Sequence, residues 1–436
     1  MYSASRCTLA VAAAASFVLI AVVADYDDIA GYTPVSDVTP HSLLDLDMKE
    51  IEEGTDLLTA AGFAAAWRAY AVGGNSEKTD SIRTIRGFSL SAQEKLTGEK
   101  WFDIYEDYWG VGPDYADQFT ASACNGTGTF ANVAPVTRGE GCLKGAQYQN
   151  LWMYVVHELE DAVGDCRAGD LNANDGGPHA WDEAWAFYTG STVANGEPGT
   201  GYMLHTLAQK RCEQFATCTA DSDGSDISGT SQVNADMLEL YNEGQISLLN
   251  GDCDAAESIK DRIVDLMTVP LLQGLLRYFY LADPQAGNGS DKEAAELWAF
   301  AASVLPRIHE CDPEVADVVL SNTDISSPEA PMADGYAFVK EKLESVYSCM
   351  GISCGQVGGL VIGEPLTYYE GFEPCSGSGE GSVNKVLVSF LVIGAVAVVG
   401  VALGCFIRKR RSKKKTLDAM DANLGGFGAA KPATTL

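Results

Sequence analysis

The stretch Tyr148–Gly190 reads YQNLWMYVVHELEDAVGDCRAGDLNANDGGPHAWDEAWAFYTG. It predicts two helices, Tyr148–Cys166 and His179–Tyr188, joined by a loop rich in Gly, Asp and Asn. Large aromatic side chains run through both helices, and acidic side chains are set among them. A carboxylate is costly to bury unless a counter-charge accompanies it. The stretch therefore predicts a helical core that contains a cation site.

Six side chains in these two helices carry oxygen or nitrogen donors that a metal ion could use. They are Tyr154, His157, Glu158, Asp161, Asp182 and Glu183. The first four recur at spacings of three and four residues, which places them on one broad helix face. Helical bundles build metal sites from Glu and His side chains that project from facing helices. An oxygen-rich set with one His suits a hard cation such as Fe(III) better than zinc or copper.

Two other interpretations of the same residues stay open. The segment His157–Asp161 (HELED) resembles the HExxH motif of zinc peptidases, although Asp161 stands where the second His is required. A surface zinc peptidase with Glu158 as its base is thus one alternative. The other is an adhesion protein that binds no metal, in which the acidic face is simply solvated.

Two arginines are candidates for holding a small anion beside the metal. Arg277 precedes two tyrosines in RYFY, and Arg211 follows Lys210 in KRC. An Arg guanidinium can bind a carboxylate- or carbonate-like anion through two parallel hydrogen bonds. The alternative is that Arg277 only covers apolar surface. The chain has no GxSxG or P-loop motif, so hydrolase and nucleotide-binding functions have no support.

Both ends of the chain predict targeting segments rather than parts of the fold. Met1–Ala24 has the pattern of a secretory signal peptide. Val386–Ile407 is uncharged and long enough to cross a bilayer, and the basic tail 408–436 follows it directly. Residues 363–385 form a Gly/Ser-rich stalk. We therefore expect a single-pass type I protein of the plasma membrane, with the helical part 25–362 and the stalk 363–385 outside the cell.

The expected outer part is strongly acidic. The whole chain has a formal net charge of −31, and its tail is basic, so the outer part is more acidic still. Such a surface repels nucleic acid and concentrates cations. The sequons at Asn125 and Asn288 predict glycosylation, in agreement with an extracellular location.

Ten cysteines lie in the expected outer part, an even number that predicts up to five disulfides in an oxidising compartment. They are Cys124, Cys142, Cys166, Cys212, Cys218, Cys253, Cys311, Cys349, Cys354 and Cys375. Their spacing lacks the paired CxxC pattern of zinc ribbons, so we interpret them as disulfide partners rather than metal ligands. The connectivity cannot be read from the sequence.

The fold class is predicted to be all-α, with many helices in two bundle-like halves. The polar stretch 221–230 is the best candidate for an internal boundary. Gly110–Gln147 is expected to be a loop region. The other predicted helices are Leu43–Val72, Leu90–Trp109, Tyr202–Cys218, Ser231–Leu249, Asp254–Tyr280, Asp291–Cys311 and Pro331–Cys349.

Six blocks, in chain order, resemble the algal iron-assimilation family, whose membrane-anchored members are the phytotransferrins or iron-starvation-induced proteins. The blocks are LWMYVVHELEDAVGDC, HAWDEAWAFYTGS, LAQKRCEQFATC, VPLLQGLLRYFYLAD, LPRIHECDPEVA and YSCMGISC. They lie within Leu43–Val357. The resemblance implies a non-enzymatic surface protein that captures ferric iron with carbonate as a synergistic anion, followed by endocytosis. Reductase and endocytic partners are not identified by it.

Overall fold

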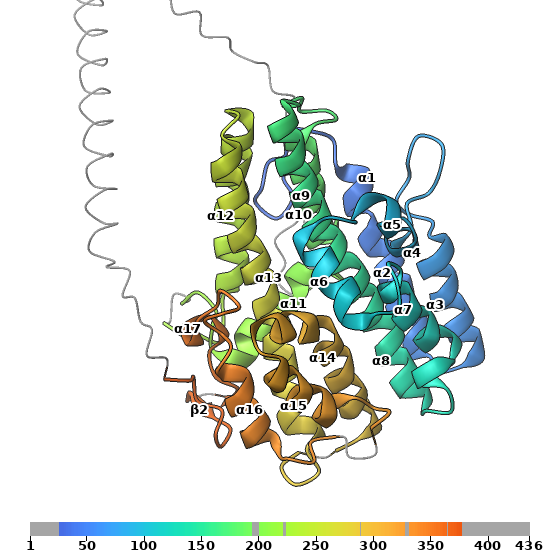
Figure 1. The fold of residues 1–436 in the computed structure, drawn as a ribbon, viewed down its shortest axis with the longest axis vertical. Coiled ribbons are helices and arrows are strands. Elements are labelled where there is room, and N and C mark those ends of the chain that lie inside the picture. Colours follow the sequence, from blue (N-terminus) through green and yellow to red (C-terminus); the bar gives the residue numbers. More distant parts are fainter. Residues whose placement is uncertain are drawn as a thin grey trace, which may run out of the picture. The chain divides into compact units, whose positions relative to one another are not determined.

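The two predicted helices form α9 (Trp152–Ala168) and α10 (Gly177–Thr189), which lie side by side in the computed structural model (Figure 1). Gly169 ends α9 with a φ of +83°, in the left-handed region that favours glycine. Gly177 opens α10 against α9, since a Cβ there would lie 2.6 Å from the carbonyl oxygen of Ala162. The Gly-rich loop therefore allows α10 to start in direct contact with α9.

The structure describes residues 26–193, 200–220, 224–287, 289–327, 331–363 and 365–376. The helices before α9 are α1 (Thr39–Ser42), α2 (Leu44–Asp56), α3 (Ala60–Val72), α4 (Ile85–Leu90), α5 (Ala92–Lys95), α6 (Lys100–Trp109), α7 (Tyr115–Asn125), η1 (Gly128–Phe130), α8 (Pro135–Gly145) and η2 (Ala146–Leu151). Those after α10 are α11 (Leu204–Phe215), α12 (Gln232–Leu249), α13 (Cys253–Ala282), α14 (Asp291–Cys311), α15 (Pro313–Thr323), α16 (Tyr336–Glu344) and α17 (Cys354–Val357). The described chain is thus mostly helical, as predicted.

The helices α8, η2 and α9 follow one another without a break from Pro135 to Ala168, and η2 is a π-helical turn. The expectation of a loop over Gly110–Gln147 is wrong, because this region contains α7 and α8. The glycines that suggested a loop serve helix packing instead. A Cβ on Gly141 would lie 2.4 Å from the Phe130 ring, and one on Gly145 would lie 2.5 Å from Thr120.

Two predicted helices are each divided into shorter helices at a residue with a positive φ. Leu43–Val72 divides into α2 and α3 at Leu58, whose φ is +51°, and the Thr59 side chain then caps α3 by accepting from the Gly62 N–H. Leu90–Trp109 divides at Gly98, whose φ is +96°. The long helices α12, α13 and α14 agree closely with the prediction, and α14 has the predicted bounds.

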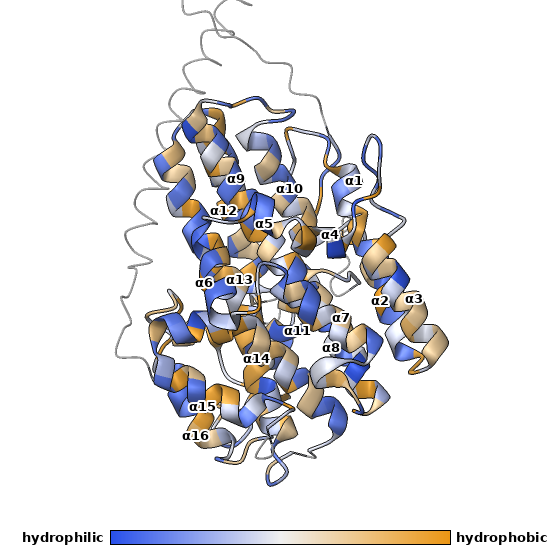
Figure 2. Ribbon diagram, turned by 45° about the vertical axis from the view of Figure 1, so that its right-hand side comes forward, coloured by the Kyte–Doolittle hydropathy of each residue, from blue (hydrophilic) through white to orange (hydrophobic). Residues whose placement is uncertain are grey.

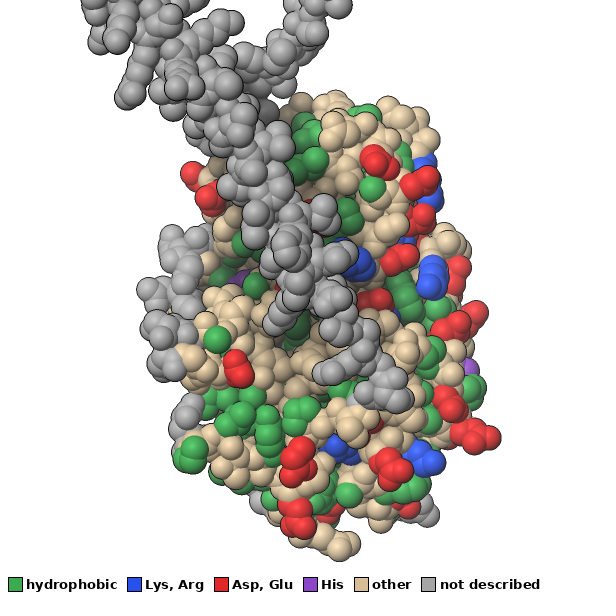
Figure 3. Space-filling model, turned by 90° about the vertical axis from the view of Figure 1, so that its left-hand side faces the viewer, with side chains coloured by type: hydrophobic (Ala, Val, Ile, Leu, Met, Phe, Trp, Pro, Cys, Tyr) green, Lys and Arg blue, Asp and Glu red, His purple; other side chains and the backbone are tan. Residues whose placement is uncertain are grey.

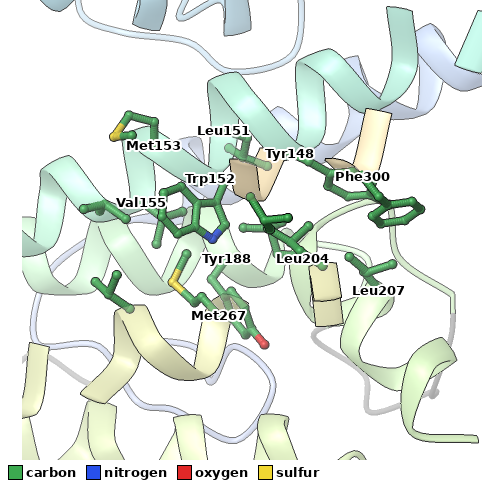
Figure 4. Packing of buried hydrophobic residues seen from close by; sticks show 14 of the residues in the cluster. Tyr148, Leu151, Trp152, Met153, Val155, Tyr188, Leu204, Leu207, Met267 and Phe300 are labelled. Carbon is green, nitrogen blue, oxygen red and sulfur yellow. The ribbon is translucent and has the colours of Figure 1, made fainter. Parts of the chain in front are cut away.

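The core gathers around Trp152, which is fully buried. Figure 4 shows side chains from η2 and α9 meeting Tyr188 of α10, Leu204 of α11, Met267 of α13 and Phe300 of α14. Helices that lie far apart in the sequence therefore share one hydrophobic centre. In Figure 2 hydrophobic and hydrophilic residues occupy different faces along these helices, as expected for amphipathic helices that cover a core.

All ten cysteines predicted to pair form disulfides. The pairs are Cys124–Cys142, Cys166–Cys253, Cys212–Cys218, Cys311–Cys349 and Cys354–Cys375. The second of these closes the longest loop, of 87 residues, and joins the end of α9 to the start of α13. The last two disulfides lie in the C-terminal part of the described chain. There the strands β1 (Val361–Gly363) and β2 (Thr367–Tyr368) form a short antiparallel hairpin. The all-α prediction did not include this hairpin.

Several predictions fall outside the described residues: the signal peptide 1–24, Asn288, the part of the stalk from 377 to 385, the membrane helix 386–407 and the tail. Within the described ranges, none of the helices is both long and apolar enough to span a bilayer. The described residues up to Ser376 belong to one compact unit. Figure 3 shows acidic side chains spread over one face of the described part.

The packing of α12 on α10 gives a stability prediction. A Cβ on Gly244 would lie 2.0 Å from the ring of Trp181, a side chain with no exposed surface. We expect Gly244→Ala to lower the free energy of unfolding by about 1–3 kcal/mol, because the ring has no room to move. Urea unfolding of the full-length chain measures this.

The matched control is Gly164→Ala in α9, where no atom lies within 4 Å of the added Cβ. Alanine is the better helix former, so this variant should gain roughly 0.5–1 kcal/mol. Equal stability of Gly244→Ala and the natural chain would contradict the packing described here.

Candidate metal centre

A pocket of about 270 Å³ lies between α9, α10 and the segment around α4 and α5. We call it the α9–α10 pocket. Its lining combines acidic, basic and imidazole side chains with one phenol. They are Lys78, Arg83, Lys95, Tyr154, His157, Glu158, Asp161, Asp165, Asp175, His179 and Glu183, together with Ala180.

Helix α9 supplies one wall of this pocket. Tyr154, Glu158, Asp161 and Asp165 follow one another at spacings of four, three and four residues and form one stripe. His157 lies beside this stripe and also lines the pocket. The structure therefore brings together the four α9 residues predicted from the sequence.

Three side chains at the pocket meet with the geometry of a metal-ligand group: His41 of α1, and His179 and Glu183 of α10. Their ligand atoms all lie within 4.8 Å of one another. The Nε2 atoms of His41 and His179 lie 2.6 and 2.9 Å from the same oxygen, Oε1 of Glu183. Of the three, sequence reasoning selected only Glu183. The spacing of four residues from His179 to Glu183 could have indicated His179, whereas no local pattern indicates His41.

Asp182, the neighbour of Glu183, points away from this group and holds the N-terminal segment. Its carboxylate accepts hydrogen bonds from the N–H groups of Val35 and Ser36 at 2.8 and 2.9 Å and from the Tyr32 hydroxyl at 2.5 Å. The Ser36 hydroxyl also donates to Asp182, at 2.7 Å. These bonds fix the chain that leads into α1 and thereby position His41.

The same serine orients His179. Because the Ser36 hydroxyl donates to Asp182, it accepts from Nδ1 of His179, which lies 2.8 Å away. Nδ1 therefore carries a proton, and Nε2 is the nitrogen that faces Glu183. A partner that fixes one imidazole nitrogen and leaves the other toward the centre is the usual arrangement around metal-binding histidines.

The two pocket glutamates have opposite pKa shifts. Burial opposes ionisation of Glu183, but hydrogen bonds from His179 and His41 outweigh it and lower the Glu183 pKa. Burial, then the charge of Glu183 and a hydrogen bond to it, raise the pKa of Glu158 well above its usual value. Glu158 therefore holds a proton and shares it with ionised Glu183.

The pKa values of the two imidazoles are also shifted in opposite directions. Burial would lower the His179 pKa, but the hydrogen bond and charge of Glu183 outweigh it and raise this pKa. Burial lowers the pKa of His41 despite its bond to Glu183.

Tyr154 extends the group by one phenol. Its ring stacks on Phe88 with centroids 3.6 Å apart, and its hydroxyl accepts from Nζ of Lys95 at 3.2 Å. Burial, followed by the charges of Glu158 and Glu183, raises the Tyr154 pKa. Tyr154 and Glu158 thus lie in the same pocket as Glu183, which contacts both histidines.

Three basic side chains face these acidic groups across the pocket. Arg83 is 9% exposed and donates to the Ser76 hydroxyl at 2.9 Å. Its charge acts on Glu183, Tyr154 and Glu158. Lys78 and Lys95 line the same pocket. Sequence reasoning did not select these three, which lie outside the α9–α10 stretch.

The remaining predicted residues lie apart from the His41, His179 and Glu183 group. His157 lines the pocket, but its Nδ1 lies 2.6 Å from the Glu99 carboxylate, and Asp161 is exposed. Arg211 and Arg277 line a different pocket, which shares no residue with the first.

The fold and this cluster define a disulfide-linked helical protein with a buried set of imidazole, carboxyl and phenol groups suited to a metal ion. The family model of the low iron-inducible periplasmic protein (Fea1) matches residues 6–364, and the chain belongs to that family. The resemblance to the algal iron-starvation-induced proteins is thereby confirmed. The family is not a known enzyme family, and its induction is consistent with a role in iron uptake. No curated protein and no solved structure matches the chain.

The raised pKa of Glu158 gives a prediction for the metal-free protein. Between the ordinary carboxyl pKa, about 4.3, and the higher folded value, the folded chain binds a proton that the unfolded chain has lost. Stability from this group is therefore full below about pH 4 and falls as the pH rises. Glu158→Gln keeps the neutral form and should remove this loss.

We expect Glu158→Gln, in chelator-treated buffer, to be more stable than the natural chain at pH 7 and to show no comparable gain at pH 4. Thermal unfolding at the two pH values measures the difference, and the pH 4 pair serves as the internal control. A variant that is less stable than the natural chain at pH 7 would contradict a protonated Glu158.

Proposed function

We propose that this chain binds ferric iron as its cargo at the cell surface, together with carbonate, and delivers it by endocytosis. The observation that carries the proposal is the cluster in which Glu183 contacts His41 and His179, while Glu158 and Tyr154 line the same pocket. These side chains place one phenol, two carboxyl groups and two imidazoles in and beside one pocket.

The donor chemistry supports Fe(III) over other metals. Hard cations favour carboxylate and phenolate oxygens, and imidazole also suits iron. Two histidines and one glutamate alone would equally suit zinc. Tyr154 and Glu158 add oxygen donors, and their raised pKa values mean that a trivalent ion must displace their protons. The stronger charge of Fe(III) favours that exchange.

Carbonate has basic partners in the same pocket. A volume of about 270 Å³ exceeds the space of one metal ion and leaves room for a small anion. Arg83 can offer two parallel hydrogen bonds to carbonate, with Lys95 and Lys78 nearby. We therefore assign carbonate to Arg83 rather than to Arg211 or Arg277, which line the other pocket.

The same groups explain how a lower pH would release the metal ion. Metal binding requires neutral His41 and His179 and ionised oxygen donors, so it releases protons. A lower pH returns these protons and protonates carbonate, which weakens the site. With the predicted membrane helix 386–407, endocytosis into an acidic compartment would let the cargo leave.

The alternatives from the sequence have less support. A zinc peptidase built on His157 and Asp161 would need both as ligands, but His157 pairs with Glu99 and Asp161 is exposed. A solvated adhesion surface does not account for the buried Glu158, whose pKa is raised by burial and by the charge of Glu183.

Variants at the neighbouring residues Asp182 and Glu183 should distinguish an effect on metal binding from an effect on folding. We expect Glu183→Gln to weaken ferric binding by at least about 100-fold with little loss of stability, because it removes a central ligand. Asp182→Asn should instead destabilise the chain by roughly 2–3 kcal/mol, because a buried hydrogen-bonded charge is lost. Equilibrium dialysis with ferric nitrilotriacetate and urea unfolding measure the two effects. Full ferric binding by Glu183→Gln would remove α10 from the site.

Arg83 and Arg277 form a matched pair for the anion. With bicarbonate present, Arg83→Gln should bind ferric iron no better than the natural chain does without bicarbonate, because the anion has lost its partner. Arg277→Gln should retain the bicarbonate dependence. Titrations with ferric nitrilotriacetate in bicarbonate-free and bicarbonate buffers measure both. The reverse outcome would return the anion to the arginines selected from the sequence.

A further inference from the structure

A second pocket, of about 300 Å³, lies among α8, η2, α11, α13 and α14, with the end of α2 at its edge. We call it the α11–α13 pocket. Five basic side chains line it: Lys144, Lys210, Arg211, Arg277 and Lys292. Four acidic side chains accompany them: Glu52, Asp56, Glu140 and Glu296. In a chain with a net charge of −31, this concentration of basic groups is unusual.

Two of the five cations are neutralised within the fold. Lys144 pairs with Glu140 and lies 3.5 Å from Glu296, and Lys292 lies 3.2 and 3.6 Å from the same two carboxylates. Glu140 and Glu296 are thus paired with lysines, and Glu296 also interacts with Tyr278 and with the charge of Arg211. The remaining cations must find other partners.

Arg211 is buried and forms no ion pair within 4 Å among the described residues, although its charge acts on Glu296. It is 6% exposed, and the hydrogen bond that it makes goes to Gln214, one turn along α11. Its Nε has no partner, and its guanidinium lies over the Phe300 and Tyr278 rings, 5.1 and 5.9 Å from their centroids. A buried charge in this situation is costly unless an anion accompanies it.

Two more cations stand beside Arg211 without counter-charges. Arg277 and Lys210 line the same pocket, and neither forms an ion pair with the residues that the structure describes. The rings of Tyr148 and Tyr278 and the side chain of Leu207 supply apolar surface. Figure 4 shows Tyr148 and Leu207 at one end of the core, with Phe300 beside them.

We propose that the α11–α13 pocket binds a small oxyanion with two or more negative charges, of the carboxylate or phosphate class. The fork of a guanidinium matches the geometry of both classes, and Arg211, Arg277 and Lys210 supply three charges. A volume of about 300 Å³ is at the lower end of small-molecule sites, which fits an anion of this size. The proposal does not depend on the ferric site, because the two pockets share no lining residue.

Calorimetric titration of the full-length chain in chelator-treated buffer tests the proposal with two probes. Tricarballylate represents carboxylates and chelates metals weakly, and inorganic phosphate represents phosphates. We expect saturable binding of at least one probe, and the probe that binds identifies the class. Arg211→Gln and Arg277→Gln should each weaken it at least tenfold.

The matched control is Lys49→Gln, which removes a half-exposed cation of α2 that pairs with the exposed Glu53. It should bind the probe as the natural chain does. Arg277 is only partly buried, so Arg277→Gln tests the pocket even where Arg211→Gln lowers stability. Binding of neither probe, or binding that survives in Arg277→Gln at full strength, would overturn the proposal.

Discussion

One carboxylate oxygen, Oε1 of Glu183, holds two imidazoles together, and the rest of the candidate centre depends on it. His41 comes from the N-terminal segment and His179 from the same helix as Glu183, so this oxygen joins parts of the chain separated by more than a hundred residues. Around it the fold buries a second carboxyl, Glu158, and a phenol, Tyr154. Burying these groups side by side is unfavourable in a protein without a compensating charge. Arg83, Lys78 and Lys95 supply part of that charge across the pocket, and in our proposal a metal ion supplies the rest.

Several features of the fold hold this oxygen in place. The close approach of α10 to α9 at Gly177 aligns Glu183 with Glu158, and the disulfide Cys166–Cys253 fixes the far end of α9 to α13. Asp182 then draws in residues 32–36 through four hydrogen bonds and so places α1. The two adjacent acidic residues of α10 thus have separate roles, one facing the pocket and one organising the chain that completes it.

The sequence predicts those residues of the centre that recur at helical spacing within one helix. The α9 stripe and Glu183 follow from helical spacing, and α14 was predicted with its observed bounds for the same reason. His41 and Arg83 could not be predicted, since tertiary packing alone brings their segments to α9 and α10. Nor could spacing say which of Asp182 and Glu183 faces the pocket, because neighbours on a helix point about 100° apart. The loop expected over Gly110–Gln147 failed because glycines that permit close helix packing look like turn residues.

The most direct test of the account is the position of iron in a crystal of the full-length chain grown with ferric iron and bicarbonate. An anomalous difference map at the iron edge locates the ion without reference to any assumed ligand. The account predicts one strong peak among His41 Nε2, His179 Nε2 and the carboxylate of Glu183, at bonding distances of roughly 2.0–2.2 Å. A peak in the α11–α13 pocket or on the acidic surface, with none beside Glu183, would contradict it.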